Sequence, residues 1–307
     1  MPHDHAHHAG HGGHHHAPAD FGRAFVIGIV LNSGLVAAQI GFGIAAHSVA
    51  LLADAVHNFG DVLGLVFAWG AARLTRMAPT PTRTYGWGRT TIFAALINAV
   101  VLLVGTGAIA VESVQRLFAP GPVAGGTVMI VAAVGILLNG GTALMFMRGQ
   151  KGDLNVRGAF LHMASDAAVS LGVVIAAGLI MLTGALWLDP VASLVIGVVI
   201  VVGTWGLLRD ATALALDAVP PGIDGAAVQR CLAALPGGVE VHDLHIWGLS
   251  TTRTAATAHL VTAQPGGAVI SLACETLHAQ FEITHCTFQI ETPDAASHCA
   301  LRPDQVV

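Results

Sequence analysis

The chain has 307 residues, of which 54% are hydrophobic and only 10% are charged, and its mean hydropathy is +0.71. This composition argues against a soluble protein and predicts a membrane protein. Thirteen Lys and Arg residues, only one of them a lysine, stand against 18 Asp and Glu residues and leave a net charge of −5. Since no basic surface is available to neutralise many phosphates, we expect no nucleic-acid partner.

The first 20 residues are rich in histidine and poor in anything that could form a core. Eight of the 17 histidines lie there, at positions His3, His5, His7, His8, His11, His14, His15 and His16. Residues 1–20 are therefore expected to form a disordered cytoplasmic tail. An expression tag is the alternative, but Gly, Ala and Asp interrupt the histidines, which favours a native tail that collects metal. No apolar core with a cleavage site precedes it, so it is not a signal peptide.

Six apolar stretches follow, and each is long enough to cross a membrane. They cover residues 21–46, 48–72, 89–117, 123–147, 156–182 and 190–208. Crossing a hydrocarbon layer of about 30 Å takes about 20 helical residues. Because lipid offers no partners for backbone amides, these stretches should be helices in a bundle, and their many Gly and Ala residues allow close packing. The membrane domain is expected to span residues 21–209.

The basic residues of the connections predict the orientation of this bundle. With the N-terminus inside, the inner segments hold nine of them, namely Arg23, Arg73, Arg76, Arg83, Arg89, Arg148, Lys151, Arg157 and Arg209. The outer connections hold only Arg116. This positive-inside bias places both termini in the cytoplasm.

Residues 210–307 have a mixed composition that is typical of a soluble domain, and Pro220-Pro221-Gly222 marks its start. Residues 223–235 and 268–281 are expected to be helices, and residues 239–249, 253–262 and 283–291 are expected to be strands. The order of helix, strand, strand, helix, strand predicts a small α+β domain. Four cysteines without a CxxC pair suit reduced thiols in a cytoplasmic domain.

Ionisable residues inside the apolar stretches are few and concentrated in two of them. The second stretch holds Asp54, His57 and Asp61, and the fifth holds His162 and Asp166. Such groups cost roughly 2.5 to 3.5 kcal/mol each on insertion, so they are functional candidates. In both stretches a His-x3-Asp spacing places an imidazole and a carboxylate on one helix face, about one turn apart.

Two such helices facing each other would offer two nitrogens and two oxygens to one ion. This set suits tetrahedral Zn²⁺, whereas Ca²⁺ and Mg²⁺ favour more oxygens and Cu⁺ favours sulfur. Zn²⁺ is expected as a substrate, with Co²⁺, Cd²⁺ and Ni²⁺ as further possibilities, and no prosthetic group is expected. The alternative for either pair alone is a structural hydrogen bond. Asp54 could lie behind the ligands, carry a proton, or serve as a structural hydrogen-bonding group.

At these residues the chain resembles the cation diffusion facilitator family of proton-coupled metal exporters. The similarity is carried by residues 48–61, by Tyr85-Gly-Trp-Gly-Arg89, by His162-x3-Asp166 and by residues 242–247. It implies a six-helix transporter that works as a homodimer, with a cytoplasmic ferredoxin-like domain and exchange of metal for protons. In that family, His-x3-Asp on the second span is associated with a preference for zinc.

The terminal domain has a second group of candidate ligands. If the hairpin between the first two strands turns at Ser250-Thr251, then His242 lies directly opposite His259 on the same face of the sheet, and His245 faces the other side. The resemblance implies metal binding at His242 and His259, with a carboxylate at Glu291. For His245, His278, His285 and Cys286 we expect core or surface roles. Cys299 and His298 stand where some relatives have a pair of cysteines, but only one cysteine is present.

Three classes of function compete on this evidence. The first is a secondary exporter of divalent metal ions that exchanges them for protons by alternating access, and it is the one that we favour. The second is an intramembrane metalloenzyme, but the chain has no His-Glu-x-x-His motif, and we expect no enzymatic activity. The third is a membrane-bound sensor that binds zinc without transporting it. A bacterial inner membrane is the expected location.

Overall fold

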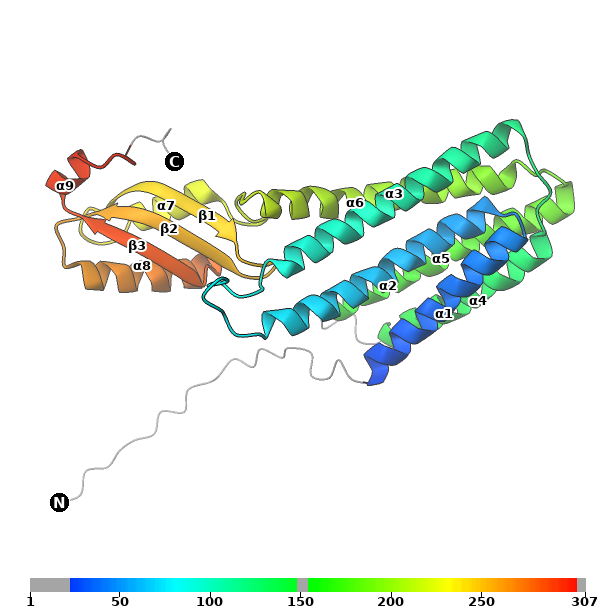
Figure 1. The fold of residues 1–307 in the computed structure, drawn as a ribbon, viewed down its shortest axis with the longest axis horizontal. Coiled ribbons are helices and arrows are strands. Elements are labelled where there is room, and N and C mark those ends of the chain that lie inside the picture. Colours follow the sequence, from blue (N-terminus) through cyan, green and yellow to red (C-terminus); the bar gives the residue numbers. More distant parts are fainter. Residues whose placement is uncertain (1–22, 148–153, 303–307) are drawn as a thin grey trace, which may run out of the picture.

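The protein consists of a bundle of long helices and a small sheet domain, which lie end to end (Figure 1). The computed structural model describes residues 23–147 and 154–302. The predicted histidine-rich tail, residues 1–20, lies outside the described residues. The bundle has a near end, which adjoins the sheet domain, and a far end, where the short connections 46–48, 119–124 and 184–187 join consecutive helices.

Six helices make up the bundle, as the sequence predicted. They are α1 (Arg23–Ala45), α2 (Val49–Thr75), α3 (Thr90–Phe118), α4 (Gly125–Phe146), α5 (Leu154–Thr183) and α6 (Leu188–Ala215). Five contain long apolar spans, and α1 contains the shorter apolar segment Ile29–Ala45. Large apolar side chains such as Val104, Leu137 and Val202 are exposed, which suits contact with acyl chains. The chain is therefore an integral membrane protein.

One helix differs from its expected length. The sixth apolar stretch was expected to end at residue 208, before the charged pair Arg209 and Asp210, but α6 continues to Ala215. The two charges lie on the exposed surface of this continuation, where they form an ion pair at 2.9 Å. The first charged residues after the apolar stretch therefore mark the end of the apolar surface of α6, and the helix ends later.

The helices form two groups. α3 packs along α6, while α1, α2, α4 and α5 lie together beside this pair (Figure 1). α2 also packs closely on α3, because Gly60 leaves room for the side chain of Leu102. A Cβ atom added at Gly60 would lie only 2.2 Å from a methyl carbon of Leu102. Small residues permit this close approach of two membrane helices.

The sheet domain has the α+β organisation that the sequence predicted. Its elements are α7 (Gly225–Ala233), β1 (Glu240–Gly248), β2 (Thr254–Val261), α8 (Gly266–Phe281), β3 (His285–Glu291) and α9 (Pro293–Ser297). The strand order is β1-β2-β3, with β1 and β2 antiparallel and β2 and β3 parallel. The expected ferredoxin-like class is confirmed. The short helix α9 was not predicted, since five residues are too few for a periodic pattern.

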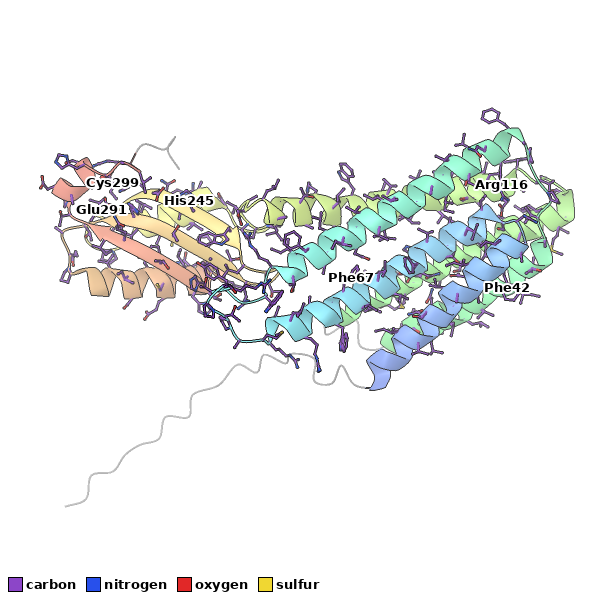
Figure 2. The ribbon with its side chains drawn as sticks, viewed as in Figure 1. Phe42, Phe67, Arg116, His245, Glu291 and Cys299 are labelled. Atoms are coloured by element: carbon purple, nitrogen blue, oxygen red, sulfur yellow. The ribbon has the colours of Figure 1, made fainter. Side chains whose placement is uncertain are left out.

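Helices α7 and α8 cover one face of this sheet. Buried side chains from both helices and from alternate strand positions form the core, including Val228, Leu232, Leu260, Leu277 and Ile283. The opposite face of the sheet carries His242, His259 and Glu291. This polar face lies at the end of the molecule beyond the bundle, where Figure 2 labels Glu291 and Cys299.

The turn between β1 and β2 connects the two parts of the molecule. The backbone N–H of Thr251 donates to Thr91 Oγ1 at the start of α3, over 3.0 Å. Arg89 and Asp217 form an ion pair beside this contact. Gly88 packs directly on the turn, since an added Cβ would lie 2.5 Å from the carbonyl oxygen of Leu249.

A cavity of about 690 Å³ lies above this turn, in the near half of the bundle. It is lined by α2 from Gly64 to Thr75, by the first two turns of α3, by Leu207 and by residues 250–253. Phe67, which is labelled in Figure 2, belongs to its lining.

Candidate metal centres

The four ionisable residues singled out in the membrane domain lie together between α2 and α5. His57 Nε2 lies 3.0 Å from Asp166 Oδ1, and His162 Nε2 lies 3.4 Å from Asp61 Oδ1. Each histidine therefore meets the aspartate of the other helix. His162 Nε2 also lies 3.7 Å from Asp166 Oδ2, one turn along its own helix. The two His-x3-Asp faces thus point at each other.

Three of the four residues of this transmembrane cluster are close enough to share one ion. His57, Asp61 and Asp166 each offer one ligand atom such that all three atoms lie within 4.8 Å of one another, while His162 lies at the edge of this group, beside Asp61. His57 is eight residues inside α2 and His162 is eight residues inside α5, which is about 12 Å of helix. The side chain of Asp166 is only 2% exposed, whereas that of His162 is 47% exposed. Asp166 is therefore enclosed within the bundle, and His162 lies at the edge of the cluster.

Asp54 does not join the four but belongs to a buried network beside them. Its Oδ2 atom accepts hydrogen bonds from Gln39 Nε2 of α1 at 2.7 Å and from Ser170 Oγ of α5 at 3.0 Å. Asn58 Nδ2 in turn donates to Gln39 Oε1 at 3.0 Å. These hydrogen bonds hold α1, α2 and α5 together beside the four candidate ligands.

The sequence reasoning missed three members of this network, Gln39, Asn58 and Ser170. A signal for Gln39 was present, because a glutamine inside an apolar membrane span needs a partner. The partner itself could not be chosen from the sequence, since that choice depends on which helices are neighbours.

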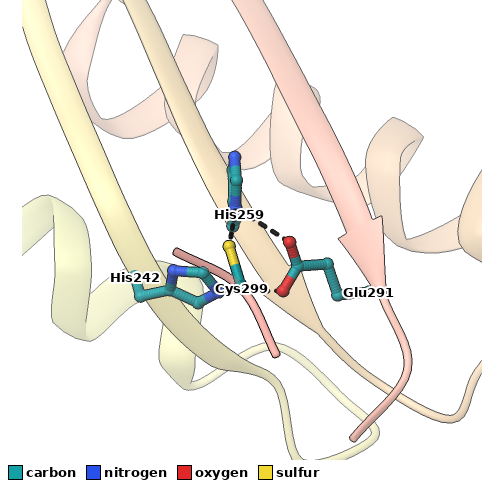
Figure 3. Close-up of side chains that lie close together, drawn as sticks. All are labelled: His242, His259, Glu291 and Cys299. Atoms are coloured by element: carbon teal, nitrogen blue, oxygen red, sulfur yellow. Dashed lines mark hydrogen bonds and ion pairs between the residues drawn. The ribbon is translucent and has the colours of Figure 1, made fainter. Parts of the chain in front are cut away.

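The sheet domain brings a second group of possible ligands together (Figure 3). His242 Nε2 lies 3.0 Å from Glu291 Oε2, and His259 Nδ1 lies 2.9 Å from Glu291 Oε1. His242 and His259 are direct cross-strand partners, as the sequence predicted. Cys299 Sγ lies 3.6 Å from His259 Nδ1, and the four residues offer ligand atoms within 4.8 Å of one another. We call this set the sheet-domain cluster.

Cys299 reaches the cluster because α9 turns the chain back over the sheet. Thr292 caps α9 through its hydroxyl oxygen, and Pro293 begins the helix. Arg302 then forms an ion pair with Glu240 of β1 at 2.9 Å, which holds the segment that carries Cys299 against the first strand.

The predicted orientation of His245 is wrong. A β-bulge lies between His242 and His245, and Asp243 within it has a φ of +53°. Asp tolerates this left-handed conformation better than most residues. The extra residue shifts the pairing, so His245 lies opposite Thr257 and shares the face of His242. The sequence register assumed a regular hairpin, which has no such shift.

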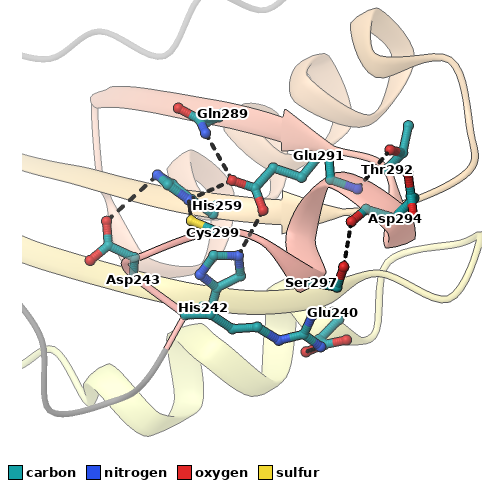
Figure 4. Close-up of polar contacts among 12 residues, drawn as sticks. Glu240, His242, Asp243, His259, Gln289, Glu291, Thr292, Asp294, Ser297 and Cys299 are labelled. Atoms are coloured by element: carbon teal, nitrogen blue, oxygen red, sulfur yellow. Dashed lines mark hydrogen bonds and ion pairs between the residues drawn. The ribbon is translucent and has the colours of Figure 1, made fainter.

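Asp243 lies beside two of the histidines on this face, and Figure 4 shows its contact with His259. One of its carboxylate oxygens lies 2.9 Å from His245 Nε2, and the other lies 3.6 Å from His259 Nε2. A carboxylate on the outer nitrogen of a histidine fixes the orientation of the ring. His259 thereby presents its Nδ1 atom to Glu291 and Cys299.

The electrostatics of Glu291 favour a charged carboxylate. Burial acts to raise its pKa, but hydrogen bonds from His242 and Gln289 outweigh burial and hold the pKa below its ordinary value. Glu291 is thus an ionised group with two imidazoles beside it. Such a site suits a divalent cation with nitrogen and oxygen ligands.

Two other candidates lie away from the cluster. His285 stacks edge-on against Tyr85 of the α2–α3 connection, with ring centroids 5.4 Å apart. Cys286 packs against the domain core, where burial raises the pKa of its thiol to about 11. A thiol that stays protonated is a poor metal ligand.

Comparisons with known proteins agree with this architecture. Residues 25–214 match the family model of the cation efflux transmembrane domain, and residues 220–293 match that of the cation efflux protein cytoplasmic domain. The sheet domain is therefore the cytoplasmic domain, and the near end of the bundle is its cytoplasmic end.

Several curated proteins are similar along nearly the whole chain. The cation efflux system protein CzcD of Alcaligenes sp. (strain CT14) is 33% identical over 303 residues, which is 96% of this chain and 95% of the relative. The zinc transporter ZitB of Escherichia coli (strain K12) is 32% identical over 95% of this chain and 93% of its own. The cadmium, cobalt and zinc/H(+)-K(+) antiporter of Bacillus subtilis (strain 168) is 29% identical over 93% of this chain and 94% of its own. The chain belongs to the cation diffusion facilitator family, a family of membrane transporters for metal cation efflux and not of enzymes.

Proposed function

We propose that this protein exports divalent metal ions, above all Zn²⁺, from the cytoplasm in exchange for protons. The observation that carries the proposal is the crosswise pairing of His57 with Asp166 and of His162 with Asp61 inside the membrane domain. The two imidazole nitrogens and two carboxylate oxygens form the donor set that tetrahedral Zn²⁺ takes. Ionisable groups inside a membrane span cost free energy, so those that are present are candidates for a function.

The exchange follows from the chemistry of these four groups. Zn²⁺ binds neutral imidazoles and ionised carboxylates, so protons and metal compete for the same atoms. Without metal, each histidine lies within reach of an aspartate of the other helix, so protons can take the place of the metal on these groups. Metal entering from the cytoplasm displaces these protons, and protons entering from outside displace the metal. An inward proton gradient then drives metal out.

The choice of metal rests on the donors and on the relatives. Nitrogen and oxygen donors also accept Co²⁺, Cd²⁺ and Ni²⁺, and geometry decides among them. One relative is named a zinc transporter, and another is named for cadmium, cobalt and zinc. Zinc is common to both names, which supports it as the principal substrate.

Alternating access is supported by the asymmetry of the bundle. The cavity of about 690 Å³ opens the cytoplasmic half between α2 and α3. Its lining residues Gly64, Ala68 and Thr75 follow Asp61 by 3, 7 and 14 residues, which places them on the same helix face as Asp61. We infer that metal reaches the transmembrane cluster along this face and leaves after the bundle has opened at the other end.

We further propose that the protein lies in a bacterial inner membrane with both termini in the cytoplasm. Seven of the nine inner basic residues lie within the described part of the chain, and Arg148 and Lys151 lie outside it. The proposed units are the tail (1–20), the membrane domain (21–209) and the cytoplasmic domain (210–307). A match to a domain named for dimers supports a homodimer.

We propose that the sheet-domain cluster binds a regulatory zinc ion through His242, His259 and Glu291. Cys299 is added as a fourth ligand because its sulfur atom lies within the same group. Asp54, with its carboxylate held by Gln39 and Ser170, does not touch the ion and acts on the orientation of α2 or on proton transfer.

Proton flux in sealed vesicles tests the transport function. The purified protein is reconstituted with a pH-sensitive dye inside, and an added zinc gradient should change the internal pH. His57→Ala and Asp166→Ala should each abolish this change, because each removes one ligand. Ser165→Ala is the matched control, since Ser165 lies on α5 among the ligands, and within the described part of the chain its hydroxyl bonds only to the carbonyl of Leu161.

The same assay separates transport from sensing. A sensor would bind zinc without any zinc-dependent change of pH in wild-type vesicles. Unchanged flux in the His57→Ala and Asp166→Ala variants would remove the assignment of the transmembrane cluster.

A further inference from the structure

The far end of the bundle holds a buried acid that the metal site does not use. Asp189 lies in the first turn of α6, and only 2% of it is exposed. Its Oδ1 atom accepts a hydrogen bond from Ser48 Oγ at 2.5 Å. Its Oδ2 atom accepts from the backbone N–H groups of Val49 at 2.7 Å and Ala50 at 3.4 Å. The carboxylate of one helix therefore caps the start of another.

The physical reason for this contact lies in the N-terminus of α2. The first N–H groups of a helix lack partners within the helix, and the helix dipole favours a negative charge there. Ser48 Oγ accepts from the N–H of Leu51 at 3.1 Å and donates its own hydrogen bond to Asp189. Asp189 and Ser48 together satisfy three N–H groups of α2.

This contact joins the two groups of helices. α6 is held to α3, where Ser113 Oγ and Ser193 Oγ lie 2.8 Å apart. α2 belongs to the other group and carries His57 and Asp61. Asp189 thus ties the α3–α6 pair to the helix that carries half of the metal ligands. At the opposite end, the cavity separates α2 from α3.

We propose that Asp189 is the outer latch of the transporter. It holds the outer ends of α2 and α6 together while the metal site faces the cytoplasm, and its bonds break when the site opens outward. The proposal rests on the alternating access proposed above. Since packed helices shift as bodies and do not stretch, an outward path between the two groups requires these helix ends to separate. Once separated, the carboxylate and the freed N–H groups both meet water, so the contact can re-form in every cycle.

A competing arrangement gives Asp189 a fixed role. The ends of α2 and α6 would then stay together in every state, as a pivot, and the bundle would open elsewhere. The two arrangements differ in whether Ser48, which is fully buried in this state, becomes accessible from outside during transport.

Labelling of Ser48→Cys distinguishes them. The variant keeps the bonds from Val49 and Ala50 to Asp189, and all four native cysteines lie in the cytoplasmic domain, out of reach of a reagent added outside. Right-side-out vesicles receive a membrane-impermeant maleimide, with and without zinc inside and an inward proton gradient. The latch predicts at least a tenfold faster labelling during zinc export.

Ser193→Cys is the matched control. Ser193 is equally buried, but it lies between α3 and α6, which move together in this proposal. It should stay protected under both conditions. Protection of Ser48→Cys in vesicles that export zinc would overturn the latch, and so would equal labelling of the two cysteines. Zinc flux is recorded in the same vesicles, and its absence from the wild-type protein would overturn the transport proposal and the latch with it.

Asp189→Asn tests the carboxylate itself. The amide keeps one acceptor atom, but it loses the charge and turns an N–H group toward the N–H groups of α2. In the Ser48→Cys background it should raise labelling without a gradient by roughly tenfold, as expected for the loss of a charge-assisted hydrogen bond. It should also raise the cytoplasmic zinc concentration for half-maximal transport, because fewer molecules face inward. Unchanged labelling in this variant would show that Asp189 does not hold the outer side closed.

Discussion

Substitution of Gly60 by alanine tests the packing of α2 on α3 beside the metal site. The added Cβ would lie 2.2 Å from Cδ2 of Leu102 and 2.6 Å from its Cγ, so Leu102 must leave its place or the helices must part. Overpacking of this kind typically costs about 1–3 kcal/mol. Gly70→Ala is the matched control on the same helix, because no atom lies within 4 Å of its added Cβ. Both variants gain the same helix propensity of up to about 1 kcal/mol, so this gain cancels when they are compared.

The two variants should therefore differ by about 1–3 kcal/mol in the free energy of unfolding, which is the cost of overpacking at Gly60. One kcal/mol corresponds to about 2–4 °C for a domain of this size, so their unfolding midpoints in detergent should differ by about 2–12 °C. Gly60→Ala should also slow zinc flux, since the neighbouring Asp61 would move with the helix. Equal midpoints for the two variants would refute the close packing of α2 on α3.

Two predictions concern the cytoplasmic domain and use protein without residues 1–20, with the transmembrane ligands removed by His57→Ala and Asp166→Ala. Cys299→Ser should weaken zinc binding by roughly a hundredfold, because one of four ligands supplies about a quarter of the 10–16 kcal/mol of a structural zinc site and a hydroxyl replaces it poorly. Equilibrium dialysis measures this, Cys231→Ser is the control, and equal affinities would remove Cys299 from the site. The second prediction concerns the protein without metal. The pKa of Glu291 is lower in the folded domain than its ordinary value of about 4.5, so its carboxylate stabilises the domain fully above pH 4.5. This stabilisation is lost as the pH falls through the lower pKa of the folded state. Glu291→Gln should flatten the acid unfolding curve below about pH 4.5, and tryptophan fluorescence, to which Trp247 of the cytoplasmic domain contributes, follows it. A curve unchanged from that of the parent would contradict this role.

The architecture could be predicted from the sequence because lipid leaves few choices. Long apolar stretches have to be helices, and the two His-x3-Asp pairs stand out against them. The crosswise contact of His57 with Asp166 then follows from two faces that each need a polar partner. The alternation of β1 and β2 likewise predicted the pairing of His242 with His259.

The position of His245, the partner of Asp189 and the role of Cys299 could not be predicted. They depend on a local bulge, on contacts between distant residues and on a short helix, and none of these has a periodic pattern in the sequence. The position of His245 was wrong because a single bulged residue, Asp243, reverses the alternation of a strand. The partner of Asp189 is 141 residues away at Ser48, and only the packing of α6 on α2 brings them together. Cys299 joins the sheet-domain cluster through a five-residue helix that no periodicity indicates.

X-ray absorption at the zinc edge tests the central claim most directly. The sample is the protein without residues 1–20, in which His242→Ala and Cys299→Ser remove the sheet-domain cluster, loaded with one equivalent of zinc. A single zinc ion held by two imidazoles and two carboxylates is expected, with ligand distances of about 2.0–2.2 Å and no sulfur at about 2.3 Å. Zinc surrounded only by oxygen, or no zinc retained after gel filtration, would contradict a metal site made by His57, Asp61, His162 and Asp166.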